Sequence, residues 1–138
     1  MIRVLFVCTE NSNRSQMAEA FARRHGAGLV EARSAGSRPS GRVDPRAIEA
    51  MREVGYDLTS HRSESIDAAG PGPWDYVVTM GCGDDCPWVA ARHREDWALP
   101  DPRDVPPAEF RAVMDDIDRR VRVLIDRIRS NPDSDAAS

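Results

Sequence analysis

A cysteine and an arginine separated by five residues are the first side chains in this sequence that can do chemistry together. The segment runs Cys8-Thr-Glu-Asn-Ser-Asn-Arg14, and Ser15 follows it directly. A thiolate at Cys8 is a nucleophile, and the planar guanidinium of Arg14 can bind two oxygens of one anion. The hydroxyl of Ser15 can donate a hydrogen bond to that thiolate. These residue types predict a site that attacks the central atom of a tetrahedral oxyanion.

The position of this segment supports the prediction, because it joins a predicted buried strand to a predicted helix. The first N–H groups of a helix are unpaired and its dipole favours negative charge, so the loop can bind an anion and stabilise the thiolate. Asn11 is expected at positive φ, which turns the loop amides inward. The alternative is a buried structural cysteine beside a surface arginine. The predicted substrate-binding residues are Thr9, Glu10, Asn11, Ser12, Asn13 and Arg14.

Two more cysteines, Cys82 and Cys86, follow another predicted strand in the segment Met80-Gly-Cys-Gly-Asp-Asp-Cys-Pro87. The carboxyl ends of parallel strands meet at one edge of a sheet, so we expect these thiols near Cys8. The glycines and acidic residues around them favour a polar segment over a buried core position. Zinc bound by both thiols and His93 is the other alternative, but a closed site needs a fourth ligand at a metal-like interval. We therefore predict no metal and no cofactor.

These motifs together resemble the arsenate reductases that share the fold of the low-molecular-weight protein tyrosine phosphatases. Both branches have the Cys-x5-Arg-Ser loop, but the Ser-Gln-Met-Ala-Glu segment after the arginine is similar to the reductases. The usual loop has Gly and often Cys where this chain has Glu10 and Asn13. The resemblance extends from Ile2 to about Ile128 and rests on Val7-Cys-Thr-Glu-Asn-Ser-Asn-Arg-Ser-Gln-Met-Ala-Glu19, Ser34-Ala-Gly36, Asp44-Pro-Arg-Ala47, Ser60-His61, Val78-Thr79 and Asp101-Pro102.

The resemblance implies a reaction sequence for the reduction of arsenate to arsenite. Cys8 attacks arsenic held by the loop and Arg14, and Asp101 protonates the departing oxygen. Cys82 then attacks Cys8 and releases arsenite, and Cys86 attacks Cys82. The resulting disulfide passes to a thioredoxin or glutaredoxin-like reductant. Some members of the family bind potassium near the loop, and the positions to inspect are Asn11, Glu19, Ser34 and Glu64.

Two other functions stay open at this point. One is a phosphomonoester (protein tyrosine) phosphatase that uses Cys8, Arg14 and Asp101, and the other is a non-catalytic redox or oxyanion sensor. The phosphatase needs neither of the later thiols. Phosphatases of this family place an aromatic residue after Asp-Pro, whereas this chain has Arg103, which disfavours phosphotyrosine. Asp101 between two prolines is also compatible with an ordinary turn.

The elements that position these residues alternate along the chain. Apolar runs predict strands at 2–7, 29–35, 74–80 and 97–99, and helical spacing predicts helices at 15–25, 45–54, 60–69 and from about 106 to 128. This pattern predicts an α/β fold, a three-layer sandwich in which helices cover both faces of a four-stranded parallel sheet. Residues 1–130 are expected to form a single catalytic domain, and 131–138 a disordered tail. The histidines His25, His61 and His93 show no pairing in sequence and are expected at the surface or in loops.

Composition excludes several classes of function. The 138 residues are 41% hydrophobic and 30% charged, and no apolar run is long enough to span a bilayer. The net charge of −4 disfavours binding to nucleic acid or to an anionic membrane. All 19 basic residues are Arg, so chemistry that needs a lysine is absent. We expect a cytoplasmic monomer whose first residues form a strand and not a signal peptide.

Overall fold

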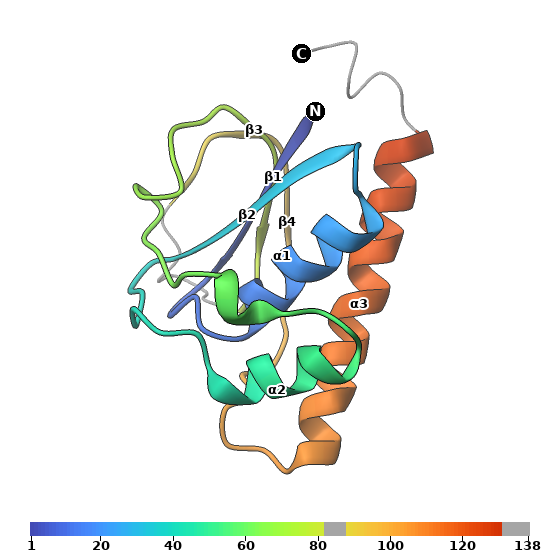
Figure 1. Cartoon of the computed structure of the whole chain (residues 1–138). Helices are drawn as coiled ribbons and strands as arrows, with labels where there is room; N and C mark the ends of the chain where they lie inside the picture. The colour runs from blue at the N-terminus through green and yellow to red at the C-terminus, as the bar shows by residue number, and fades with distance from the viewer. Residues whose placement is uncertain (82–87, 131–138) are drawn as a thin grey trace.

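The centre of the computed structural model, which describes residues 1–81 and 88–130, is a sheet of four parallel strands in the order β2-β1-β3-β4 (Figure 1). The predicted tail at 131–138 and the thiols Cys82 and Cys86 lie outside the described residues. The elements are β1 (Ile2–Cys8), α1 (Arg14–His25), β2 (Val30–Gly36), α2 (Pro45–Glu53), the 3-10 turn η1 (Leu58–Ser60), β3 (Trp74–Thr79), β4 (Ala91–Asp96) and α3 (Pro107–Ser130).

The register of the strands brings three carboxyl ends together. Cys8 at the end of β1 lies opposite Gly36 of β2, and Val7 lies opposite Thr79 of β3. The backbone N–H of Met80 donates to the carbonyl of Val7 at 2.8 Å, so the chain beyond β3 starts beside the loop that follows β1. This edge of the sheet is therefore where loops from separate parts of the sequence can share one site.

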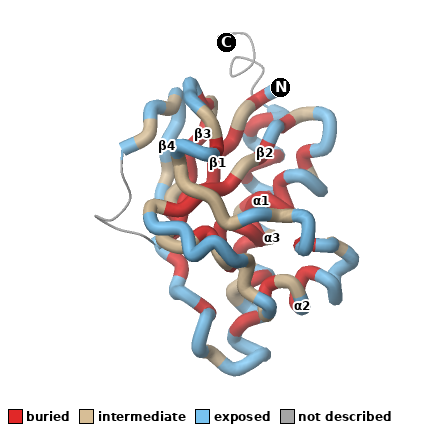
Figure 2. Tube along the Cα trace, turned by 60° about the vertical axis from the view of Figure 1, so that its left-hand side comes forward, coloured by how far each residue is buried: buried red, intermediate tan, exposed pale blue. Residues whose placement is uncertain are grey.

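The two faces of the sheet are covered differently. On β1, Val4 and Phe6 face a core shared with α1, α2 and α3, whereas Leu5 and Val7 face a smaller core. Trp74 and Val77 of β3 complete the smaller core together with turn residues such as Ala69, and Figure 2 shows buried residues running along the central strands. The predicted parallel α/β fold is confirmed. The predicted helices on both faces are not seen in residues 1–81 and 88–130, where all three α-helices pack on one face and turns cover the other.

Two predicted elements are wrong. The fourth strand is β4 and not 97–99, because an edge strand with mostly exposed polar side chains carries no apolar signal. Trp97 and Leu99 enter the core directly after that strand. No helix forms at 60–69, where η1 is followed by extended chain and turns. Ile66 and Ala69 contact the smaller core from there, and two apolar contacts are too few for a helical stripe.

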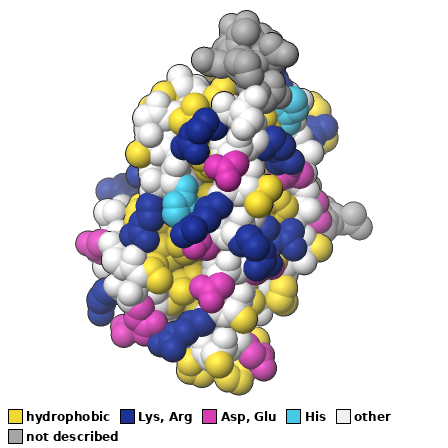
Figure 3. Space-filling view, turned by 90° about the vertical axis from the view of Figure 1, so that its right-hand side faces the viewer, with side chains coloured by type: hydrophobic (Ala, Val, Ile, Leu, Met, Phe, Trp, Pro, Cys, Tyr) yellow, Lys and Arg dark blue, Asp and Glu magenta, His cyan; other side chains and the backbone are white. Residues whose placement is uncertain are grey.

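The helix boundaries follow their sequence signals. Asp44 caps α2 by accepting from the Arg46 N–H at 2.9 Å, and Pro45 occupies the first turn. The apolar stripe of α3 is buried, whereas its outer face mixes acidic and basic side chains, as in the view of Figure 3. Asp118 and Arg122 form one such pair at 3.1 Å. No helix within the two described ranges is long and apolar enough to cross a membrane.

Truncation of the core stripe of α3 tests this packing. Ile117 is fully buried, so Ile117→Ala is expected to lower the free energy of unfolding by about 2–5 kcal/mol. Val123 lies on the same helix but is 59% exposed, so Val123→Ala should change it by less than about 0.5 kcal/mol. Urea unfolding followed by circular dichroism gives both values. Equal losses in the two variants would contradict the placement of α3 on the sheet.

Candidate active site

Cys8 ends β1 in a buried position, with only 2% of its surface exposed. Its Sγ lies 2.9 Å from the Oγ of Ser15, which is fully buried in the first turn of α1. Residues 9–13 connect the strand to the helix, and the Asn13 side chain accepts a hydrogen bond from the backbone N–H of Arg14. A thiolate at Cys8 would therefore receive a hydrogen bond from Ser15 and face the positive end of a helix.

Asn11 gives the loop its shape. Its φ is 52°, the only positive value outside glycine in the described chain, and it confirms the prediction from the sequence. Its Nδ2 donates to Ser15 Oγ at 2.8 Å, and its Oδ1 accepts from the backbone N–H of Glu64 at 2.8 Å. Gly36 packs closely behind the loop, because a Cβ there would lie 2.7 Å from the carbonyl of Thr9. Asn11 is thus a structural support of the loop.

A second layer of hydrogen bonds supports Asn11 from below. The Nε2 of Gln16 donates to the backbone carbonyls of Asn11 and Arg62, both at 2.9 Å, so its Oε1 faces His61. His61 Nδ1 donates to that oxygen at 3.0 Å, and His61 Nε2 then accepts from the Tyr56 hydroxyl at 2.8 Å. Burial lowers the pKa of His61, which favours this neutral form.

His61 lies in the loop after η1 and His93 is exposed on β4, as expected, whereas His25 ends α1 and is partly buried. The side chain of His61 is 2% exposed, and His25 lies 2.7 Å from Asp118 and stacks on Phe21. One partner of each histidine is distant in sequence, since Asp118 is 93 positions from His25 and Gln16 is 45 positions from His61. Only the packing of α1 against distant segments brings these groups together.

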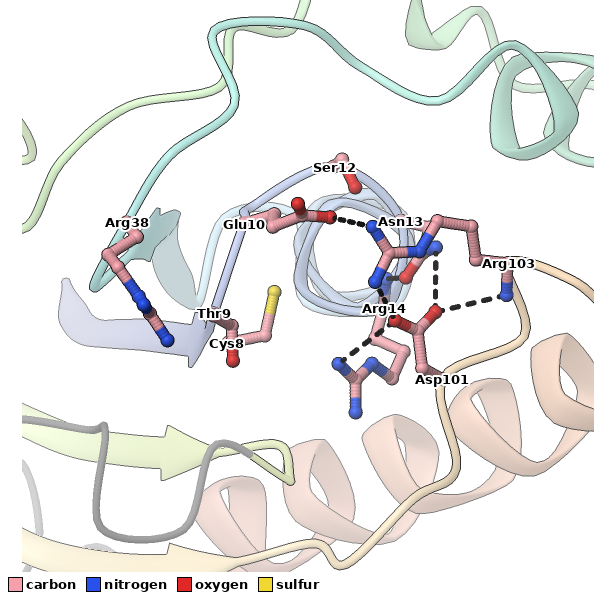
Figure 4. A pocket seen from close by; sticks show the side chains of 9 residues that line it. All are labelled: Cys8, Thr9, Glu10, Ser12, Asn13, Arg14, Arg38, Asp101 and Arg103. Carbon is pink, nitrogen blue, oxygen red and sulfur yellow. Dashed lines mark hydrogen bonds and ion pairs between the residues drawn. The ribbon is translucent and has the colours of Figure 1, made fainter.

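A cavity of about 410 Å³ opens above the loop (Figure 4). Five of the six predicted binding residues line it, but Asn11 does not, because its side chain is used beneath the loop. Ser15 likewise contacts Cys8 from below. Two arginines that sequence analysis did not assign to binding, Arg38 and Arg103, also line the cavity. The full lining is Cys8, Thr9, Glu10, Ser12, Asn13, Arg14, Arg38, Asp101 and Arg103.

Arg14 is held from the opposite side of the cavity. Its Nη1 donates to the carbonyl of Leu99 at 2.9 Å, and its Nη2 lies 4.0 Å from Asp101. Gly81 fits closely against it, since a Cβ there would lie 2.6 Å from Nη1. The buried Nε–H of Arg14 has no acceptor among the described residues. An anion oxygen in the cavity is the kind of acceptor that this donor lacks.

Asp101 lies at the rim between two arginines. It accepts from the backbone N–H of Arg103 at 3.0 Å and from Asn13 Nδ2 at 3.4 Å. Burial raises the pKa of Asp101, but the Arg103 N–H, the charge of Arg14 and the Asn13 amide together outweigh burial and hold the pKa below its usual value. The side chain is therefore ionised at neutral pH when no anion fills the cavity.

The two carboxylates among the positions to inspect for potassium, Glu19 and Glu64, already form ion pairs with arginines. Glu19 accepts from Ser34 Oγ at 2.6 Å and pairs with Arg23 at 2.8 Å. Glu64 pairs with Arg33 at 3.1 Å. Each carboxylate thus already faces a guanidinium. In the part of the chain that the structure describes, no three His, Cys, Asp or Glu side chains cluster as a metal site.

Comparison with known proteins places this geometry in a family. Residues 3–134 match the model of the low molecular weight phosphotyrosine protein phosphatases. A protein of Synechocystis sp. described as a glutaredoxin arsenate reductase is 42% identical over 131 residues, which are 93% of this chain and 99% of that protein.

Two solved structures of similar proteins agree with the fold. One, described as an arsenate reductase in the phosphate binding state, has a TM-score of 0.85 and 41% identity and covers 93% of this chain and 99% of its own. A thioredoxin-dependent arsenate reductase of Corynebacterium glutamicum has a TM-score of 0.76 and 34% identity and covers 94% of this chain and 62% of its own. Because the family model spans nearly the whole sequence, the chain belongs to the low molecular weight phosphotyrosine protein phosphatase family.

Proposed function

We propose that this protein is an arsenate reductase that uses Cys8 as the nucleophile. The observation that carries the proposal is the surroundings of Cys8, whose sulfur lies 2.9 Å from Ser15 Oγ below a cavity lined by Arg14. A tetrahedral oxyanion supplies the acceptor that the buried Nε–H of Arg14 lacks among the described residues. The similar proteins described as arsenate reductases support arsenate as that oxyanion.

In the first step, the Cys8 thiolate attacks arsenic and one oxygen departs as water. The loop amides and Arg14 bind the other oxygens and stabilise the charge that develops on them. Asp101, which lines the cavity, then delivers a proton to the departing oxygen. Its pKa is low in the empty site, but the negative charge of a bound oxyanion favours the protonated carboxyl. Binding of the substrate thus prepares the acid.

In the later steps, a Cys82 thiolate attacks the Cys8 sulfur, and the electron pair of the sulfur–arsenic bond stays on arsenic, which leaves as arsenite. Cys86 then attacks Cys82, which frees Cys8 and produces the Cys82–Cys86 disulfide. An external dithiol reduces this disulfide. The course of β3, which ends at Thr79 beside the loop that follows β1, supports this relay.

The reductant is either a thioredoxin or a glutaredoxin-like protein. The similar proteins include one described as a glutaredoxin arsenate reductase and one as thioredoxin-dependent, so both systems belong in the assays. The cytoplasmic location, the monomeric state and the single catalytic domain at residues 1–130 stay predictions.

Loss of the nucleophile or of the arginine tests the proposal. Cys8→Ser should have no detectable turnover, and Arg14→Lys should lower kcat/KM at least about 100-fold, because an ammonium cannot bind two oxygens in one plane. Arg24→Lys on the same helix, where Arg24 binds the Val54 carbonyl at the surface, should behave as the parent protein. Arsenite formed with each reductant is measured. If the parent protein hydrolyses an aryl phosphate and does not reduce arsenate, it is a phosphatase instead.

The role of Asp101 has its own test. Asp101→Asn keeps the shape of the side chain but cannot donate a carboxyl proton, so kcat should fall by about 10²- to 10⁴-fold. Asp104→Asn removes a charge three residues away that does not line the cavity and should leave kcat unchanged. The same steady-state assay of arsenite formation compares the two. Similar kcat values in both variants would remove Asp101 from the mechanism.

The relay predicts that variants of the later thiols differ in whether they complete one turnover and whether they continue to further turnovers. Cys86→Ser should release about one arsenite per protein and then stop with Cys8 joined to Cys82, whereas Cys82→Ser should stop before arsenite is released. Quenched samples analysed for arsenite and for disulfide-linked peptides give both results. Continued steady-state turnover of Cys86→Ser would mean that the external thiol resolves the protein directly.

A further inference from the structure

The side chain of Arg103 joins the two loops that form the rim of the cavity. Its Nη1 donates to Glu10 at 2.7 Å, and its Nη2 donates to Asp101 at 2.9 Å. Glu10 belongs to the loop after β1, whereas Asp101 and Arg103 follow β4. Figure 4, which looks along the axis of α1, shows the guanidinium reaching across the N-terminal end of the helix between the two carboxylates.

The backbone around Arg103 is also held by hydrogen bonds. Arg46 of α2 donates from Nη1 to the Arg103 carbonyl at 2.7 Å and to the Pro102 carbonyl at 3.3 Å, and from Nη2 to the Val105 carbonyl. The Arg46 guanidinium also lies over the ring of Phe110, 4.8 Å from its centre. Arg103 thus forms a bridge between Glu10 and Asp101. The backbone that carries this bridge is fixed to α2 by Arg46.

The ion pair with Arg103 explains why a carboxylate, that of Glu10, can line a cavity that binds an anion. Glu10 lines the same cavity as Arg14 and Arg38, where its charge would repel a bound anion. The pair with Arg103 neutralises this charge and also fixes where the Arg103 guanidinium lies. Glu10 thus acts as the anchor of an arginine across the mouth of the site.

The bridge treats free and substituted oxyanions differently. When Cys8 attacks the central atom in line, the oxygen opposite the sulfur faces Asp101 and the mouth. In a free oxyanion this oxygen is terminal and can accept a hydrogen bond from Arg103. In a monoester it carries the organic group, which must displace the guanidinium, break both ion pairs and leave Glu10 unpaired beside the anion.

We propose that the Glu10–Arg103 pair is a selectivity gate that admits free tetrahedral oxyanions and disfavours anions with an organic substituent. The inference rests on the proposed function in one respect, namely that the anion binds in the loop above Cys8. It assigns a role to two residues that the chemical steps do not use.

Protection of Cys8 from iodoacetamide measures the gate without any turnover. Mass spectrometry of the Cys8 peptide gives the concentrations of inorganic phosphate and of phenylphosphonate, which cannot be hydrolysed, that halve the rate of alkylation. In the parent protein phenylphosphonate should require about tenfold more than phosphate, the effect of losing two partly exposed ion pairs. Arg103→Ala should reduce this ratio to about two or less, and Glu10→Gln, which leaves the pair of Arg103 with Asp101, should reduce it to about threefold.

Two further variants separate the bridge from general charge. Arg111→Ala removes another half-exposed arginine, paired with Glu53 outside the cavity, and should keep the tenfold ratio. Arg103→Lys keeps the charge but cannot bridge two carboxylates with a planar group, so it should behave as Arg103→Ala. A parent-like ratio in folded Arg103→Lys or Arg103→Ala would overturn the gate. Failure of phosphate to protect Cys8 in the parent protein would instead contradict the anion site itself.

Discussion

The left-handed backbone of Asn11 is the constraint on which the rest of the site depends. With φ at 52°, the chain turns back from β1 to α1 within five residues, which places the Cys8 sulfur beside Ser15. The conformation is held because the Asn11 side chain bonds in two directions, to Ser15 above and to the backbone of Glu64 behind. Most side chains disfavour positive φ, whereas asparagine tolerates it and also supplies the polar groups that hold the turn.

Much of the fold could be predicted because its central elements carry strong local signals. The buried strands β1 and β3 are apolar runs, and α3 carries a regular stripe from Phe110 to Ile128. The edge strand β4 carries no such signal, since only one of its neighbours is a strand and its side chains are mostly exposed. The apolar residues next to it, Trp97 and Leu99, are buried by tertiary contacts after the strand ends. The apolar pattern of a sequence indicates which residues are buried. An edge strand is mostly exposed, so this pattern does not identify it as a strand.

The candidate site divides in the same way between local and distant contacts. The cysteine, the arginine, the serine and the turn at Asn11 lie within eight consecutive residues, so their spacing predicts the loop. The partners that complete it lie far along the chain: His61 is 45 positions from Gln16, and Arg103 is 93 positions from Glu10. Glu10 shows what the sequence alone does not predict. Its carboxylate would repel an anion bound in the loop, and only the structure shows that Arg103 neutralises this charge.

Gly81 connects the anion site to the segment that carries the later thiols. It lies one residue before Cys82 at a φ of 83°, and a side chain there would meet Arg14 Nη1 at 2.6 Å and the Leu99 carbonyl at 2.8 Å. The Arg14 guanidinium, which we propose binds the anion, is therefore in close contact with the backbone at residue 81. Any shift of Arg14 toward an anion changes the space available to residue 81, and only glycine has both the conformation and the room for this contact. In the proposed mechanism, this close contact would link binding of the oxyanion by Arg14 to the position of Gly81.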